Sequence, residues 1–188
     1  MKIAIRHILL FILLALLLPS CGYHKLGSHQ EEVFKAWSDM ENEGQRRIDL
    51  ARHVVDTYIK DDISNKELLT QIKESRANAE LLSMEMTPGN LGQDYVTRYQ
   101  EAQNQLKSDL NKYFGVMKSR EWQKNDPDAV AFRDESKQID DSLNKHILLY
   151  NTAALRYNTT RKHFWNSFTA SMARFRPKGY FKDLPITK

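Results

Sequence analysis

Two arginines and an aspartate stand close together in the first half of the chain. Arg46, Arg47 and Asp49 lie within one turn of a helix. A guanidinium group can bind a carboxylate or a phosphate through two parallel hydrogen bonds, so an arginine pair could clamp an anionic ligand. The same cluster could instead be a solvated helix face or one side of a salt bridge between helices. The sequence leaves both interpretations open, and the three residues are candidates for an interaction site.

Two Tyr-Asn pairs form the second group of candidates. Tyr150-Asn151 and Tyr157-Asn158 are separated by about two turns of an α-helix. On a helix the tyrosines would share one face and the asparagines the adjacent face. A buried tyrosine needs a hydrogen-bond partner, and an Asn or Arg on a neighbouring helix can provide it. The pairs therefore predict either a structural polar contact inside the protein or a recognition surface.

Patterns of catalytic and metal-binding residues do not occur in the sequence. His53, His146 and His163 are scattered, and no His-x-x-x-His pair is present. No serine stands in a Gly-x-Ser-x-Gly turn, and the Glu-x-x-His signature of di-iron bundles is missing. We therefore expect no catalytic residue, no metal site and no cofactor.

Cys21 is the single cysteine of the chain, and its neighbours predict its chemistry. It follows an apolar run from Ile8 to Leu18 and the dipeptide Pro19-Ser20. A leucine three residues before a cysteine, with a small residue directly before it, is similar to the bacterial lipoprotein signal. In that signal the sulfur receives a diacylglycerol, and cleavage leaves the cysteine as the first residue. The alternatives are a buried thiol and an intermolecular disulfide. We expect Cys21 to be lipidated.

The segment before Cys21 has the layout of an export signal, because Lys2 and Arg6 precede the apolar run. The run is well short of the about 20 residues that cross a bilayer core. Two or more acyl chains anchor a protein stably without a membrane span. We therefore expect residues 1–20 to be a signal peptide and residues 21–29 a lipidated tether. The protein would then lie in the cell envelope, attached to a membrane and facing the periplasm, and Gly22 favours the outer membrane.

Composition places the rest of the chain among helical proteins. The 188 residues are 41% hydrophobic and 28% charged, but they include only 7 glycines and 5 prolines. This composition suits helices better than the frequent turns of a β-protein. The formal net charge is +4, of which Lys2 and Arg6 contribute two. So small an excess gives no indication of nucleic-acid binding.

Apolar residues recur at every third or fourth position in four segments, which predicts four helices. The first is expected from about Gln30 to Lys60, after a capping box formed by Ser28 and Glu31. The second should run from Ser64 toward Met86, and "TPGN" at 87–90 should end it. The third carries the apolar stripe from Tyr95 to Met117, and "KNDPDAV" at 124–130 should end it. The fourth is expected from Asp126 to about 176, with Asp126 as N-cap and Pro127 in its first turn.

Long helices with short connections imply antiparallel neighbours. We therefore predict an all-α fold, an elongated antiparallel four-helix bundle over residues 30–176. Leu106 and Leu110 lie on the most regular apolar stripe and should be in its core.

A basic, aromatic tail is expected over residues 177–188. The cations at and just before its start are Arg174, Arg176, Lys178 and Lys182. An even number of antiparallel helices returns the C-terminus to the end where the chain began, which is the end near Cys21. The four cations could then contact an anionic membrane, with Phe175, Tyr180 and Phe181 among the head groups. In the alternative, the aromatic side chains fold back onto the bundle as a cap and the charges are solvated.

Two stretches, "QRRIDLARHVVDTYIKD" at 45–61 and "YNTAALRYNTTRKHF" at 150–164, together resemble the LemA family. Members of this family are N-terminally membrane-anchored helical bundles without a generally accepted activity. The corresponding positions here are Arg46, Arg47, Asp49 and Leu50, then Tyr150, Asn151, Tyr157 and Asn158. The resemblance implies a helical fold and membrane attachment. Arg52-His53 and Phe164-Trp165 depart from the pattern, and a lipid signal replaces the usual anchor, so the chain is similar to a divergent member.

These observations favour a non-enzymatic protein of the envelope. The leading hypothesis is a lipid-anchored helical bundle that binds a protein partner or acts as a scaffold. One alternative is a small-ligand receptor or enzyme that uses a polar site in the bundle. Another is an accessory lipoprotein of a membrane protease or transporter. A water-filled pocket lined by the arginines or the Tyr-Asn residues would favour the receptor or enzyme, whereas a bundle centre filled by side chains would count against it.

Overall fold

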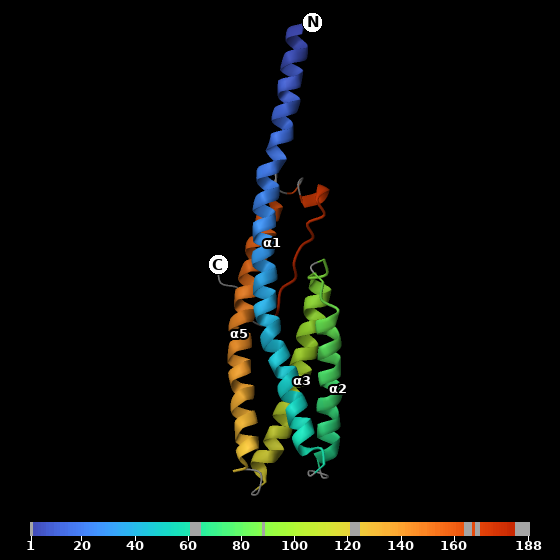
Figure 1. The fold of residues 1–188 in the computed structure, drawn as a ribbon, viewed down its shortest axis with the longest axis vertical. Helices are drawn as coiled ribbons and strands as arrows, with labels where there is room; N and C mark the ends of the chain where they lie inside the picture. The colour runs from blue at the N-terminus through green and yellow to red at the C-terminus, as the bar shows by residue number, and fades with distance from the viewer. Residues whose placement is uncertain are drawn as a thin grey trace.

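The structure, a computed structural model, is all-α over the residues that it describes. These residues are 2–60, 65–87, 89–120, 125–163, 167 and 170–182, with side chains from residue 23 onward. The long helices are α1 (Lys2–Tyr58), α2 (Lys66–Met84), α3 (Gln93–Ser119) and α5 (Pro127–Lys162). They pack along one axis, most extensively α1 on α5 and α2 on α3, and α1 extends beyond the others at its N-terminal end (Figure 1).

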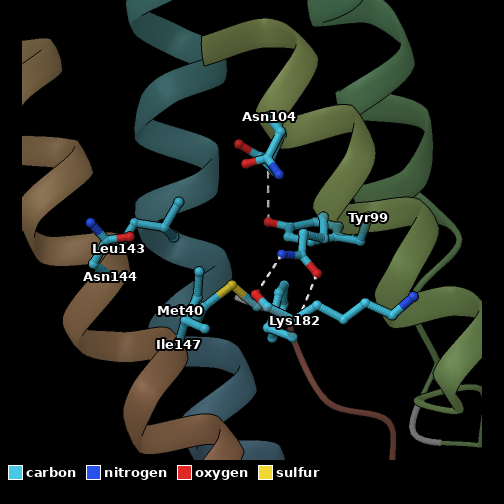
Figure 2. A pocket seen from close by; sticks show the side chains of 10 residues that line it. Met40, Tyr99, Asn104, Leu143, Asn144, Ile147 and Lys182 are labelled. Atoms are coloured by element: carbon cyan, nitrogen blue, oxygen red, sulfur yellow. Dashed lines mark hydrogen bonds between the residues drawn. The ribbon is translucent and has the colours of Figure 1, made fainter. Parts of the chain in front are cut away.

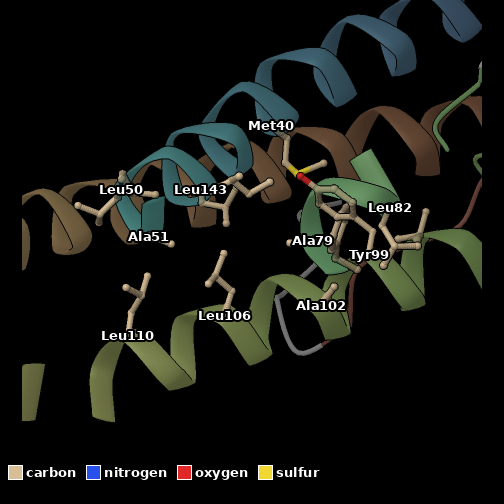
Figure 3. Packing of buried hydrophobic residues seen from close by; sticks show 14 of the residues in the cluster. Met40, Leu50, Ala51, Ala79, Leu82, Tyr99, Ala102, Leu106, Leu110 and Leu143 are labelled. Atoms are coloured by element: carbon tan, nitrogen blue, oxygen red, sulfur yellow. The ribbon is translucent and has the colours of Figure 1, made fainter. Parts of the chain in front are cut away.

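The core is built from the predicted apolar stripes. Leu106 and Leu110 of α3 have no exposed surface, as predicted. Figure 3 shows both leucines pointing toward Ala51 of α1 and Leu143 of α5. Burying an aliphatic side chain of this size contributes about 1.5–3 kcal/mol. Aliphatic packing therefore joins three helices in this part of the molecule.

A second part of the core is aromatic. The ring of Trp37, on α1, lies 5.1 Å from Tyr99, 5.3 Å from Tyr150 and 5.9 Å from Phe181, centroid to centroid. Tyr95 is a further neighbour at 5.6 Å. We call these five residues the aromatic cluster. Each pair of rings contributes about 0.5–1.5 kcal/mol beyond the area it buries. The cluster joins α1, α3 and α5 to the C-terminal segment.

The first helix begins earlier than predicted. The structure places its start at Lys2 rather than near Gln30, so residues 21–29, expected to be a tether, are helical. The Ser28–Glu31 capping signature is not used, because the chain is already helical before it. Leu26 is fully buried, and the Tyr23 ring packs on Phe175 at 5.5 Å, so tertiary contacts support the extra turns. The Cys21 side chain lies outside the described residues, and its lipidation and the signal peptide stay predictions.

The last helix ends earlier than predicted. Its start agrees, because the Asp126 carboxylate accepts from the Asp128 amide at 3.3 Å and Pro127 opens the helix. Its end is at Lys162 rather than near Arg176. No glycine or proline marks that point, but Arg161 Nε donates to the Phe175 carbonyl at 2.8 Å and holds the returning chain. Phe164-Trp165 lie outside the described residues.

Candidate functional site

The C-terminal segment 175–182, which we call the strap, runs back along the helices as an extended chain (Figure 1). It begins just after Arg174. Among the non-glycine residues that the structure describes, Arg174 has a left-handed backbone conformation, with φ 56°. Few such residues occur in folded proteins, and they mark tight changes of direction. The strap contacts α3 and α5 through hydrogen bonds and α1 through the aromatic cluster.

The two asparagines of the Tyr-Asn pairs hold the strap from α5. Asn158 donates to the Lys178 carbonyl at 2.8 Å and accepts from the Lys178 amide at 3.0 Å. Asn151 does the same with Phe181, at 3.0 and 2.9 Å. A primary amide carries both a donor and an acceptor. Each side chain therefore binds both the N–H and the carbonyl of one strap residue, as a neighbouring β-strand would.

Two glutamines hold the strap from α3 in the same way. Gln93 donates to the Tyr180 carbonyl and accepts from the Tyr180 amide, both at 2.9 Å. Gln100 does so with Lys182, at 2.9 and 3.0 Å. We call the four amide side chains, Asn151, Asn158, Gln93 and Gln100, the amide ladder. Sequence reasoning missed the glutamines, although they are spaced along α3 as the asparagines are along α5.

The tyrosines of the pairs bind two further carbonyls of the strap. Tyr150 Oη donates to Gly179 O at 3.2 Å, and Tyr157 Oη donates to Arg176 O at 3.0 Å. Burial raises the pKa of Tyr150 well above its ordinary value and that of Tyr157 to about 12. Both phenols are therefore protonated donors at neutral pH, and all four residues of the Tyr-Asn pairs are engaged inside the molecule.

Gly179 marks the closest approach of the strap to α3. Its amide donates to the Leu91 carbonyl at 2.9 Å, directly before the first turn of α3. A Cβ at this position would lie 2.7 Å from Gln93 Cα and 2.8 Å from Gly92 O. Both are backbone atoms, so they cannot move aside as a flexible side chain would. Only glycine fits here.

The structure separates the two candidate arginines. Arg47 is buried, and its guanidinium donates to Asp140 Oδ1 at 2.6 Å and to Gln103 Oε1 at 3.1 Å. Lys107 lies 2.9 Å from the other oxygen of Asp140. Arg46 is exposed and pairs with Glu43 on its own helix at 2.9 Å. The arrangement is thus an interhelical salt bridge at Arg47 and a solvated face at Arg46, not a clamp.

Asp49, the third member of that group, is half-exposed and lies 3.4 Å from Arg52. The pair is separated by three residues on the same helix, a spacing that stabilises by a few tenths of a kcal/mol, about 0.2–0.5. Asp49 therefore belongs to the solvated face with Arg46.

A pocket of about 190 Å³ lies where the strap ends. Met40, Tyr99, Asn104, Leu143, Asn144, Ile147 and Lys182 surround it in Figure 2, together with Gln100, Gln103 and Phe181. Neither the candidate arginines nor the Tyr-Asn residues line it. Pockets for drug-sized ligands have volumes of about 300–1,000 Å³, so this one would hold only a smaller molecule.

The tail cations divide into buried and exposed groups. Lys178, expected to face lipid, is buried, with its Nζ 4.7 Å from the centre of the Phe34 ring. Burial lowers its pKa to about 8. The assignment of Lys178 to the surface was wrong because the amide ladder fixes its backbone and turns its side chain inward. Arg174, Arg176 and Lys182 are exposed.

The aromatic residues of the tail follow the alternative in which they fold onto the helices. Phe181 is 3% exposed, within the aromatic cluster, and Tyr180 is half-buried. The tail beyond Lys182 lies outside the described residues. No helix in the described part of the chain is both long and apolar enough to cross a membrane. Within the same residues, no group of three His, Cys, Asp or Glu side chains could hold a metal ion.

Comparison with known proteins gives one finding. A search of curated proteins finds no match. The model of the LemA family matches residues 36–185, which include α2, α3, α5, the strap and most of α1 after residue 30. The match covers the arginine group, both Tyr-Asn pairs and the whole amide ladder. The chain therefore belongs to the LemA family.

Proposed function

We propose that this protein is a lipid-anchored, antiparallel four-helix bundle of the cell envelope with a non-catalytic role, in which it binds a protein partner as a scaffold. Its attachment point would be the lipid on Cys21, and its bundle would face the periplasm, with the outer membrane favoured over the inner one. The alternative of an accessory lipoprotein for a membrane protease or transporter is the same activity with a more specific partner.

The observation that carries the proposal is the engagement of the polar side chains. The Tyr-Asn residues bind the strap, and Arg47 binds Asp140 and Gln103. A small ligand at these groups would first have to displace the strap or break the partly buried ion pair between Arg47 and Asp140. Leaving the buried Arg47 guanidinium without its partner is unfavourable. The contacts of these groups therefore favour a structural role inside the protein over a role in a receptor or an enzyme.

The outer surface is where a partner would bind. Leu81 and Met84 are 62% and 73% exposed at the end of α2, and Leu149 on α5 is 50% exposed. Large apolar side chains at this exposure are favourable contacts for another protein. They lie on different helices, so they distinguish two faces of the bundle.

The experiment places a photo-crosslinking residue at Leu81, Met84 or Leu149 in the full chain, expressed in cells with an intact envelope. We expect a discrete crosslinked protein from one face, with Lys66, an exposed residue at the start of α2, as the matched control position. The absence of a specific product at every position would contradict the proposal. A Cys21→Ser chain should leave the membrane fraction, and its retention there would contradict lipid anchoring.

A further inference from the structure

A second, basic pocket lies at the end of the molecule where the strap begins. Its volume is about 520 Å³, and it is lined by Gln30, Thr87, Gly89, Asn90, Arg174, Arg176 and Lys178. Arg174 and Arg176 bring two exposed cations to it, the Lys178 side chain is buried, and none of the described residues that line it is acidic. Two guanidinium groups at one opening attract an anion more strongly than dispersed charges would.

The arginines of this pocket are available to a ligand. Arg174 and Arg176 are exposed, and neither forms an ion pair with any residue that the structure describes. The nearest acidic residue of the α2–α3 connection, Glu85, is already paired with Arg98 at 3.2 Å. Guanidinium groups match the oxygens of phosphate bidentately, and the Thr87 hydroxyl and Gln30 amide can add neutral donors.

Asn90 braces the opposite wall of the pocket. The Asn90 side chain accepts from the Thr87 amide at 2.9 Å and donates to the Glu85 carbonyl at 2.6 Å. On the strap side, Asn158 holds the backbone of Lys178. Hydrogen bonds therefore hold the chain at Thr87 and at Lys178 on the two sides of the pocket, which reduces the entropy lost by these segments on binding.

The position of the pocket points to lipid as the source of the anion. The Phe175 ring, next to Arg174, packs on Tyr23, which is two residues from Cys21 and thus about 3 Å along α1. Met172 and Tyr23 are 72% and 56% exposed beside the arginines. Exposed apolar and aromatic side chains next to cations are typical of surfaces that contact the interface of an anionic membrane.

We propose that the pocket formed by Arg174, Arg176, Thr87 and Gln30 binds the phosphate of an anionic lipid head group. Binding at this point would fix the end of the bundle against the membrane. The assignment of the phosphate to lipid rests on the proposed membrane attachment, whereas binding of the phosphate group itself depends on the pocket alone.

The test uses the full chain purified in an uncharged detergent and titrated by calorimetry with dihexanoyl phosphatidylglycerol, a soluble anionic lipid. We expect saturable binding that weakens with salt, and about tenfold weaker binding by Arg174→Gln/Arg176→Gln. The matched control is Lys66→Gln/Lys145→Gln, which removes the same charge from exposed residues outside the pocket and should bind as the original chain does.

Three outcomes would overturn the proposal. They are no binding by the original chain, equal losses in the two double variants, and inorganic phosphate binding as tightly as the lipid, which would make the pocket a site for free phosphate. The Cys21→Ser chain separates this proposal from the anchoring proposal. It should bind the soluble lipid normally even though it no longer fractionates with membranes, and loss of lipid binding in that chain would contradict an independent pocket.

Discussion

The two halves of the bundle are held together by different interactions. Around Leu106 and Leu110, aliphatic side chains from neighbouring helices fill the centre. At the other half, the aromatic cluster surrounds Phe181, and the amide ladder satisfies the backbone of the strap that delivers this ring. Around the two leucines the packing depends on volume and contact, beside the Arg47–Asp140 ion pair, whereas the strap depends on hydrogen bonds that must be made in full. Substitutions should therefore separate the two halves.

The largest effect is expected in the aliphatic half. Leu106→Ala or Leu110→Ala should lower the free energy of unfolding by about 2–5 kcal/mol, because each removes a fully buried side chain and leaves a cavity. Chemical denaturation measures the change.

The control for this pair must be chosen from the structure. Lys107 lies between the two leucines in sequence, but its ammonium is 2.9 Å from Asp140, so truncating it disturbs the Arg47 ion pair. Ser108, exposed on α3, is the better control, and Ser108→Ala should change stability by no more than about 0.5 kcal/mol. Equal effects at Ser108 and the leucines would mean that α3 is not packed as described.

The amide ladder should give the next largest effect. Asn151→Ala leaves a buried N–H and a buried carbonyl of Phe181 without their partners and should cost about 1–3 kcal/mol. Gln100→Ala breaks the two corresponding hydrogen bonds to the Lys182 backbone. Lys182 lies at the exposed edge, where water can replace these bonds, so the loss of stability should be smaller.

Hydrogen exchange distinguishes local release of the strap from global unfolding. In Asn151→Ala the Phe181 amide should exchange faster than the amides of α2, because only the strap loses its bonds. If both exchanged at the same new rate, the strap and the helices would form a single cooperative unit, and the proposed difference between the two halves would be wrong.

The fold could be predicted from the sequence to the extent that it depends on local periodicity. The stripe through Tyr99, Leu106 and Leu110 identified α3 and its buried face, and Asp126-Pro127 identified the start of α5. The match to the family model confirmed the resemblance carried by the arginine pair and the Tyr-Asn pairs. Each of these signals lies within one segment of the chain.

What the sequence could not predict depends on partners that are distant along the chain. The Asn151 and Gln100 amides meet the strap 30 and 82 residues later, so neither their roles nor the burial of Lys178 can be read from neighbouring residues. The early end of α5 has the same origin, since it follows from the bond between Arg161 and the returning chain. The early start of α1 likewise reflects the burial of Leu26, a tertiary contact.

A third substitution tests the close approach of the strap to α3. Gly179→Ala would place a Cβ 2.7 Å from Gln93 Cα, which requires the strap or the first turn of α3 to shift. We expect a loss of stability of about 1–3 kcal/mol. Gly115→Ala is the matched control, because nothing lies within 4 Å of the new Cβ and alanine favours helix. If Gly179→Ala were as harmless as the control, the strap would not be seated as described.

The smallest effect concerns Lys178 and depends on pH. Burial lowers its pKa to about 8 from an ordinary value of 10.5, so between these values the unfolded chain holds a proton that the folded chain has released. The free energy of unfolding must then rise with pH in this window, by about 1–2 kcal/mol after allowing for partial solvation. Lys178→Met keeps a long side chain over Phe34 and Tyr157 but removes the charge, so its stability at pH 7 should be higher. Its unfolding free energy should also lack this rise between pH 8 and 9.5.

Denaturation series at pH 7, 8 and 9.5 measure both differences. The control is Lys182→Met, at an exposed position of the same strap, which should retain the original pH profile. A profile for Lys178→Met that stays parallel to the original would contradict the lowered pKa of Lys178 in the folded protein.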